Sequence, residues 1–296
     1  MNISCIRILM SKSGLIVEGG GMKCAYSAGI LDRFLDDGIT FDECIGVSAG
    51  SGNLASYLAN QRERNLHFYT IYQKHPEYLG IRNYLKHGSY FNLQYIYGTI
   101  TNSTGIDPVD HQALMENPAE YYLTATNART GEAEYLSGHD MKKDDFRAIM
   151  ASCAIPVMCK PIELNGNLYF DGGVSDSIPV QKALDDGCDK LVVLLENPRS
   201  FFRQPQKYKP FYHFFLRNYP EIVRKIDNRH LDYHVVIAYV KKLEEERRAF
   251  VFAPSHQGAV KTTTKDSQDI HEQYNLGIAD YDCRREELYE FLNGSQ

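Results

Sequence analysis

Gly46-Val47-Ser48-Ala49-Gly50 is the stretch from which the fold of this chain can be worked out. Residues 43–45 before it are typical of a short buried strand, and residues 52–58 after it are typical of the first turns of a helix. Ser48 therefore stands at a strand-to-helix corner, where a serine projects its hydroxyl into a cleft. Gly46 and Gly50 let the backbone turn sharply, and Ser48 becomes a candidate nucleophile for acyl transfer.

A second block of small residues follows the apolar residues 15–18, upstream of Ser48. It consists of Gly19, Gly20, Gly21, Met22 and Lys23. Backbone N–H groups at a strand-to-helix turn point outward, and the helix dipole adds roughly half a positive charge there. We expect the amides of Gly20, Gly21 and Met22 to form an oxyanion hole. Lys23 either adds positive charge to its rim or is simply solvated on the first helical turn.

The base that would take the proton of Ser48 has two kinds of candidate. Histidines lie downstream in the chain order of some Ser-His-Asp enzymes, but none has a distinguishing neighbourhood: His213, His230, His234, His256 and His271. Asp171 is the better candidate, because it ends a predicted strand and because Gly172 and Gly173 hold the following backbone open. An ordinary Asp-Gly turn is the alternative. A carboxylate with its usual pKa of about 4 is a weak base toward an alcohol, so the site needs partial desolvation.

Residues 19–23, 46–50 and 171–173 form three blocks that, in this order and at these separations, resemble the signature of the patatin-like phospholipases. Residues 151–156 also resemble that family, and the resemblance covers about residues 14–196. It implies a three-layer α/β/α sandwich with a mainly parallel central sheet, and an oxyanion hole at the glycine loop. It also implies a Ser48–Asp171 dyad that hydrolyses lipid acyl esters through a covalent acyl-enzyme, with no metal or cofactor. Cys24 departs from the family, which usually has a glycine there, and this affects the expected loop geometry.

The chain divides into three parts by composition. Residues 1–13 form an N-terminal lead, with Met10 as a candidate true start; residues 14–198 form the catalytic domain; residues 199–296 form an extension that packs on it. The individual predicted elements are a helix at 22–35, paired strands at 121–126 and 134–136, a helix at 144–153, a hairpin at 161–170, a helix at 178–184, buried strands at 191–195 and 249–253, and a terminal helix at 282–292. Residues 62–118 are expected to form short helices and loops that shape the acyl pocket.

Composition excludes several classes of protein. A net charge of -6 provides no chain-wide basic field, so a nucleic-acid partner is not expected. The seven cysteines have no C-x-x-C spacing, which favours reduced thiols and a cytoplasmic location. His271-Glu272 lacks the second histidine of a zinc helix, so no metal site is expected. No apolar run approaches the ~18 residues that a membrane-spanning helix needs.

Residues 199–220 combine five basic residues, no acidic residue and eight aromatic residues. Aromatic side chains with Lys and Arg suit an anionic lipid surface, so one interpretation is peripheral membrane contact. In the other, the aromatic side chains cover the edge of the core while Arg203, Lys207 and Lys209 face water. Pro205 and Pro210 interrupt any long amphipathic helix, which favours the second interpretation.

The function predicted from these features is a serine lipid acyl hydrolase of phospholipase A, lysophospholipase or esterase type, acting on a lipid or acyl ester. A lipid transacylase with the same dyad is an alternative, because the sequence does not show how well water is excluded. A nucleotide-binding module is a third hypothesis from another class. Gly19 and Gly21 match two positions of G-x-G-x-x-G, but Cys24 occupies the third.

Overall fold

The computed structural model describes residues 11–294 of the chain, and the prediction of a start at Met10 lies outside this part. Its centre is an eight-stranded sheet in the order β5-β6-β3-β2-β1-β7-β8, with β4 also paired to β3. The parallel strands are β1 (Ser13–Val17), β2 (Glu43–Val47), β3 (Glu120–Asn127), β7 (Lys190–Leu194) and β8 (Ala249–Phe252). The antiparallel strands are β4 (Ala133–Ser137), β5 (Ile162–Leu164) and β6 (Asn167–Asp171). The mainly parallel sheet is confirmed.

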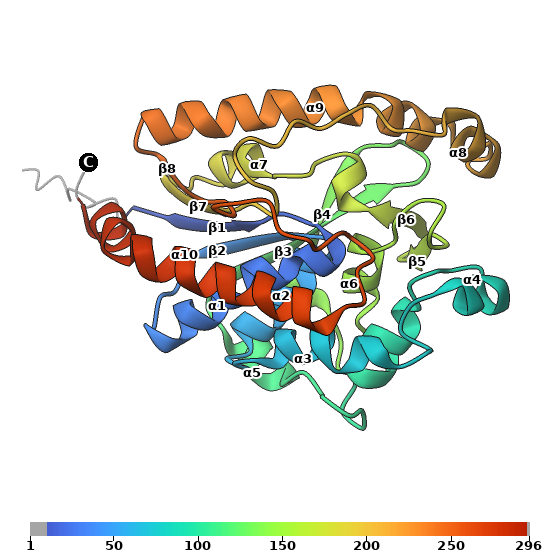
Figure 1. Cartoon of the computed structure of the whole chain (residues 1–296), viewed down its shortest axis with the longest axis horizontal. Coiled ribbons are helices and arrows are strands. Elements are labelled where there is room, and N and C mark those ends of the chain that lie inside the picture. Colours follow the sequence, from blue (N-terminus) through green and yellow to red (C-terminus); the bar gives the residue numbers. More distant parts are fainter. Residues whose placement is uncertain (1–10, 295–296) are drawn as a thin grey trace, which may run out of the picture.

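Helices cover both faces of this sheet, as Figure 1 shows. One face carries α1 (Ala25–Asp36), α2 (Ala49–Leu58) and α10 (Ser267–Asn293), and the other carries α7 (Val180–Asp185) and α9 (Pro220–Glu245). Val192 and Leu194 pack into the first layer, while Leu191 and Val193 pack into the second. Because β7 is buried on both faces, its sequence is a continuous apolar run without alternation. The three-layer α/β/α sandwich is therefore confirmed.

Most predicted elements around the centre of the chain are confirmed, with shifted ends. The helix predicted at 22–35 begins as a 3-10 turn (Gly21–Cys24) before α1, and the one predicted at 144–153 shortens to α6 (Arg147–Ser152). The hairpin turn has Asn165 at φ 51° and Gly166 at φ 78°, as a two-residue turn with the strand twist requires. Residues 62–118 form α3 (Arg64–Thr70), α4 (Ile81–His87), a π-helical turn (Gln94–Ile100) and α5 (His111–Glu116), joined by loops and a 3-10 turn (Tyr72–Lys74).

The C-terminal region differs most from the prediction. The terminal helix was expected at 282–292, but α10 is 27 residues long, and the 26-residue α9 was not predicted. Both helices are rich in charged residues and bury few of their side chains, so their apolar periodicity is weak. Asp266 caps α10 by accepting hydrogen bonds from the N–H groups of Gln268 and Asp269, which is a signal that the sequence contained.

The extension is part of the sandwich. β8 adds a parallel strand beside β7, and α10 lies along α1. The backbones of α1 and α10 approach closely at two glycines: a Cβ on Gly29 would lie 2.2 Å from the carbonyl oxygen of Tyr274, and one on Gly277 would lie 2.1 Å from that of Tyr26. The boundary near residue 199 stays a prediction.

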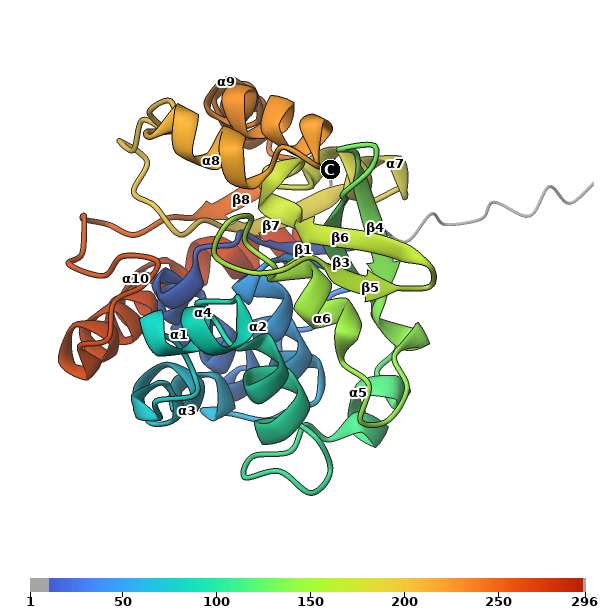
Figure 2. The ribbon, with the colours of Figure 1, turned by 90° about the vertical axis from the view of Figure 1, so that its right-hand side faces the viewer.

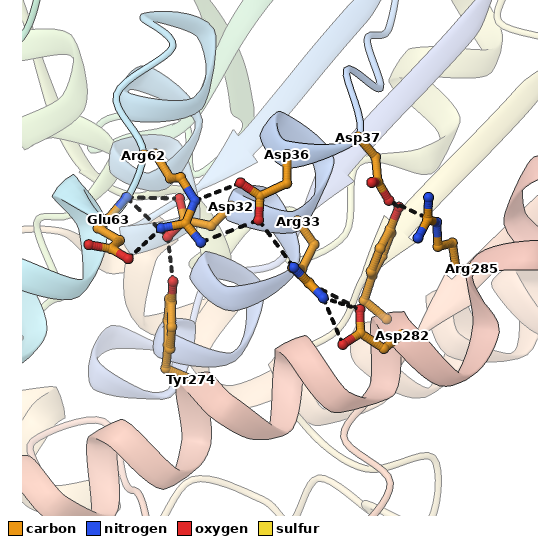
Figure 3. Close-up of polar contacts among 10 residues, drawn as sticks. Asp32, Arg33, Asp36, Asp37, Arg62, Glu63, Tyr274, Asp282 and Arg285 are labelled. Atoms are coloured by element: carbon orange, nitrogen blue, oxygen red, sulfur yellow. Dashed lines mark hydrogen bonds and ion pairs between the residues drawn. The ribbon is translucent and has the colours of Figure 1, made fainter.

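A polar network flanks this crossing (Figure 3). Arg33 on α1 donates to both carboxylate oxygens of Asp282 on α10, at 2.7 and 2.9 Å. Tyr274 donates to Asp32 at 2.6 Å, and Arg285 pairs with Asp37 at 3.0 Å. Partly exposed ion pairs of this kind each contribute about 0.2–1 kcal/mol.

The aromatic segment after β7 contains α8 (Lys209–Phe215), which lies with α9 on one side of the sheet (Figure 2). Tyr212 and Tyr219 pack in a small cluster with Phe170. The other aromatic side chains of α8 and its approach are largely exposed, at 36–79% of their area: Phe201, Phe202, Tyr208, Phe211, Phe214 and Phe215. The expectation that the aromatic side chains cover the core edge is therefore wrong for most of them, because three precede α8 and α8 itself buries only Tyr212.

The α1–α10 contact can be tested with Gly277→Ala. Alanine would favour an isolated helix by about 1 kcal/mol, but its Cβ would collide with the Tyr26 carbonyl. We expect the free energy of unfolding to fall by about 1–3 kcal/mol, measured by urea denaturation. Asn275→Ala on the exposed side of α10 is the control and should change it by less than about 0.5 kcal/mol. A Gly277→Ala variant as stable as the wild type would contradict the close crossing.

Candidate active site

Ser48 occupies the corner between β2 and α2 that the sequence predicts. Its backbone has φ 54° and ψ -129°, a conformation that is strained for a residue with a side chain. A Cβ on Gly46 would lie 2.5 Å from the Cα of Ser51, and one on Gly50 would lie 2.6 Å from the carbonyl oxygen of Val17. The turn is thus tight enough to need glycine on both sides of the serine.

Asp171 ends β6 and lies beside Ser48. Burial raises the pKa of Asp171, whereas the Ser48 hydroxyl, the charge of Arg229 and the N–H of Gly173 oppose this rise. The Gly173 N–H donates to the Asp171 carboxylate at 2.8 Å. Asp171 is only 5% exposed as a residue, so the partial desolvation that a weak base requires is present. A Cβ on Gly172 would lie 2.1 Å from the Thr124 carbonyl oxygen, so this glycine lets β6 approach β3.

Residues 151–154, at the end of α6, connect the two candidate residues. The N–H of Ser48 donates to the hydroxyl of Ser152 at 2.9 Å, and the N–H of Asp171 donates to the carbonyl of Ala154, also at 2.9 Å. One short buried segment therefore fixes the backbones of both residues, although they lie more than a hundred positions apart in the chain.

The glycine loop lies directly against Ser48. A Cβ on Gly19 would be 2.7 Å from the Cβ of Ser48. Within the described part of the chain, no acceptor takes the N–H groups of Gly20 and Gly21. The N–H of Met22 differs from the expectation, since it donates to the carbonyl of Thr262 at 3.2 Å. In this conformation the Gly20 and Gly21 amides are the ones of the three expected donors that stay without an acceptor within residues 11–294.

Two residues near the loop had open interpretations. The amine of Lys23 donates a hydrogen bond to the side-chain oxygen of Asn197 at 2.6 Å, so the lysine is bound to another side chain of the protein and is not simply solvated. Cys24 is fully buried, and burial raises the pKa of its thiol, so it packs as an apolar side chain and does not present a thiolate.

A cavity opens beside Ser48. Aromatic and aliphatic side chains from the 62–118 segment form much of its wall: Phe68, Tyr69, Tyr78, Phe91, Leu93 and Tyr97. An apolar chamber next to a candidate nucleophile suits an acyl chain. Arg64 also lines this cavity and is buried there, paired with Asp107 at 3.3 Å.

Within residues 11–294, the candidate histidines make no hydrogen bond to Ser48 or Asp171, and His213 instead pairs with Asp227 at 3.1 Å. The same residues contain no cluster of three or more side chains suited to hold a metal ion. None of the helices described has both the length and the apolar content that crossing a bilayer requires.

Sequence reasoning did not identify two contributions from the C-terminal extension. Arg229 on α9 reaches the Asp171 turn, and Thr262 covers the glycine loop, where its carbonyl oxygen would lie 2.6 Å from a Cβ on Gly21. No local motif marks either residue, because each becomes relevant only through tertiary contact.

The burial of Asp171 predicts an unusual stability effect. Its pKa is raised in the folded protein, so ionising it costs stability: the cost is absent below the unfolded-state pKa and complete above the folded-state pKa. Asp171→Asn should therefore be at least as stable as the wild type at neutral pH, and this advantage should shrink as the pH falls. Urea denaturation at several pH values measures it.

Asp227→Asn is the matched control. Despite partial burial, hydrogen bonds from Tyr212, His213 and Lys209 lower the pKa of Asp227. The expected change in stability has the opposite sign, because this carboxylate stabilises the fold above its unfolded-state pKa and loses that effect as the pH falls. Asp227→Asn should therefore be less stable than the wild type at neutral pH, and the difference should shrink in acid. Marked destabilisation by Asp171→Asn at neutral pH would mean that the fold needs the charged carboxylate.

Comparison with known proteins supplies independent information. A family model described as patatin-like phospholipase matches residues 15–184, more than half of the chain, and one described as a domain of unknown function (DUF6363) matches residues 219–293. The chain is 24% identical over 267 residues to an uncharacterized Escherichia coli protein, YjjU, covering 89% of this chain and 74% of YjjU.

Two further similarities are more distant or more partial. The lysophospholipase NTE1 of Saccharomyces cerevisiae is 25% identical over 191 residues, which cover 62% of this chain and only 11% of that protein. Among solved structures, VipD from Legionella pneumophila aligns with a TM-score of 0.44 and 14% identity, covering 92% of this chain and 67% of VipD.

Proposed function

Because the chain belongs to the patatin-like phospholipase family, we propose that it is a serine lipid acyl hydrolase of phospholipase A, lysophospholipase or esterase type. The observation that supports this most is the position of Ser48: it lines an apolar cavity and lies beside both the buried Asp171 carboxylate and the glycine loop, whose Gly20 and Gly21 amides have no acceptor within residues 11–294. Lysophospholipase activity in the NTE1 relatives agrees with this class of substrate.

In the proposed mechanism, the Ser48 oxygen attacks the ester carbonyl carbon while Asp171 accepts the hydroxyl proton. The carbonyl oxygen becomes an oxyanion, which the Gly20 and Gly21 amides stabilise. When the tetrahedral intermediate collapses, the ester C–O bond breaks and the leaving alkoxide takes the proton from Asp171. Water then attacks the acyl-enzyme by the same steps and releases the fatty acid. No metal or cofactor takes part in this scheme.

Replacement of the dyad residues tests the proposal. Ser48→Ala and Asp171→Asn should each lower kcat on p-nitrophenyl esters at least a thousandfold, because the first removes the nucleophile and the second removes the base. Ser200→Ala, at an exposed serine, is the control and should be unchanged. A fluorophosphonate probe should label Ser48, located by peptide mass spectrometry. Labelling of folded protein at another residue, or retained activity in Ser48→Ala, would refute the assignment.

The two alternatives lead to different measurements. A transacylase would use the same acyl-enzyme and pass the acyl group to an alcohol or lysolipid, so product analysis with a labelled donor separates it from a hydrolase. A nucleotide-binding module needs close approach of a pyrophosphate to the glycine loop, but Thr262 covers Gly21. Tight calorimetric binding of NAD, NADP or ATP would be needed to favour it.

We also propose that the protein is cytoplasmic and contacts a membrane surface through residues 199–220. The exposed aromatic side chains of α8 and its approach lie in the same segment as the exposed Lys207, Lys209 and Arg217, a combination that suits an anionic lipid surface. The described cysteines are free, five of them buried, as expected of a reducing compartment. An enzyme acting on bilayer lipids requires such contact.

Vesicle flotation tests the membrane contact. The wild type should float with vesicles containing phosphatidylglycerol and should do so several-fold less with phosphatidylcholine alone, because the basic side chains favour anionic lipid. Phe211→Ser combined with Phe214→Ser should abolish flotation, whereas Leu231→Ser, at an exposed leucine of α9, should not. Equal flotation of both variants would show that α8 is not the contact.

A further inference from the structure

Two arginines of the C-terminal extension, Arg229 and Arg203, lie near the proposed active site. Arg229 on α9 places a terminal guanidinium nitrogen 2.9 Å from the position that a Cβ on Gly173 would occupy, next to the Asp171 turn. The Nε atoms of both Arg229 and Arg203 are buried and lack a hydrogen-bond acceptor. Within residues 11–294, neither guanidinium forms an ion pair or a side-chain hydrogen bond.

The two guanidinium groups are neighbours. Arg203 stacks on Tyr233 with its guanidinium carbon 4.2 Å from the ring centroid, and Tyr233 lies one helical turn after Arg229 on α9. Burial and the charge of Arg203 lower the pKa of Arg229 to about 10, so the arginines repel each other. The carboxylates of Asp171 and Glu18 are near, yet neither forms an ion pair with Arg229. An anion that bound both guanidinium groups would offset their repulsion and supply the hydrogen-bond acceptors that they lack.

In the proposed mechanism, the leaving group of the substrate lies on the Asp171 side of Ser48. Asp171 returns a proton to the leaving alkoxide, so the leaving-group oxygen must lie within hydrogen-bond reach of Asp171. The acyl chain occupies the cavity beside Ser48, and neither arginine contributes to the wall of that cavity. The rest of the leaving group therefore extends past Asp171, toward Gly173 and Arg229.

We propose that Arg229 and Arg203 bind the phosphate of the substrate's leaving group, so that the extension makes the enzyme selective for phosphate-bearing lysolipids or phospholipids over neutral acylglycerols. This inference rests on the proposed hydrolase function. Guanidinium groups suit it because their planar N–H pairs match two phosphate oxygens at once. Both side chains are partly exposed, so a headgroup can reach them from solvent.

Kinetics with paired substrates test the selectivity. Lysophosphatidic acid and monoacylglycerol with the same acyl chain differ only by the phosphate, and kcat/KM is measured on the alkaline plateau of the pH profile, where Asp171 is ionised. Arg229→Gln and Arg203→Gln should lower kcat/KM for lysophosphatidic acid by about 10- to 100-fold, and at least tenfold more than for monoacylglycerol. Arg224→Gln, an exposed arginine of the same helix, should leave both values unchanged. Equal losses on the two substrates, or no loss, would overturn the inference.

Binding to the Ser48→Ala protein separates this inference from the proposed catalysis. Glycerol 3-phosphate and inorganic phosphate are titrated calorimetrically against Ser48→Ala alone and against Ser48→Ala combined with Arg229→Gln or with Arg229→Lys. Glycerol 3-phosphate should bind tighter than inorganic phosphate; the glutamine should abolish binding, and the lysine should restore part of it. Equal affinity for the two ligands would indicate a free-phosphate site and overturn the leaving-group assignment. Retained hydrolysis by Ser48→Ala would refute the proposed function without changing this binding result.

Discussion

The burial of the Asp171 carboxylate next to Ser48 is the constraint on which the rest of the structure depends. A charged group placed there costs stability, and the protein offsets part of this cost with the Gly173 N–H, the Ser48 hydroxyl and the charge of Arg229. Desolvation also makes the carboxylate a stronger base than it would be in water. The same feature that burdens the fold is therefore the one that the proposed chemistry requires.

Close backbone packing makes this burial possible. Ser152 and Ala154 fix the two reacting backbones from a single segment, and glycines remove the Cβ atoms that would separate the neighbouring loops. The three glycine-containing blocks lie at the carboxyl ends of β1, β2 and β6. Because β1 and β2 are parallel and adjacent, their ends meet at one edge of the sheet, where loops gather into a site.

The C-terminal extension contributes to the site as well as to the fold. α10 completes the helical layer over α1, β8 extends the sheet, and α9 delivers Arg229 to the Asp171 turn. Thr262 covers the glycine loop and takes up the amide of Met22. An extension integrated in this way reaches the site from one side, while side chains of the 62–118 segment line the cavity beside Ser48 from another.

Local backbone geometry and residue spacing in the sequence predicted the Ser48 corner and the Asn165-Gly166 hairpin. The three-layer sandwich and the pairing of Asp171 with Ser48 were implied by the resemblance of the three motifs to a known family, because on residues alone an ordinary Asp-Gly turn remained the alternative. The sequence did not reveal α9, since a charged helix that buries a narrow face has little apolar periodicity. Only the tertiary structure decided that Met22 is bound by Thr262, that Arg229 faces Gly173 and that the α8 aromatic side chains are exposed. These contacts join residues far apart in the chain, and no local rule of conformation or spacing encodes them.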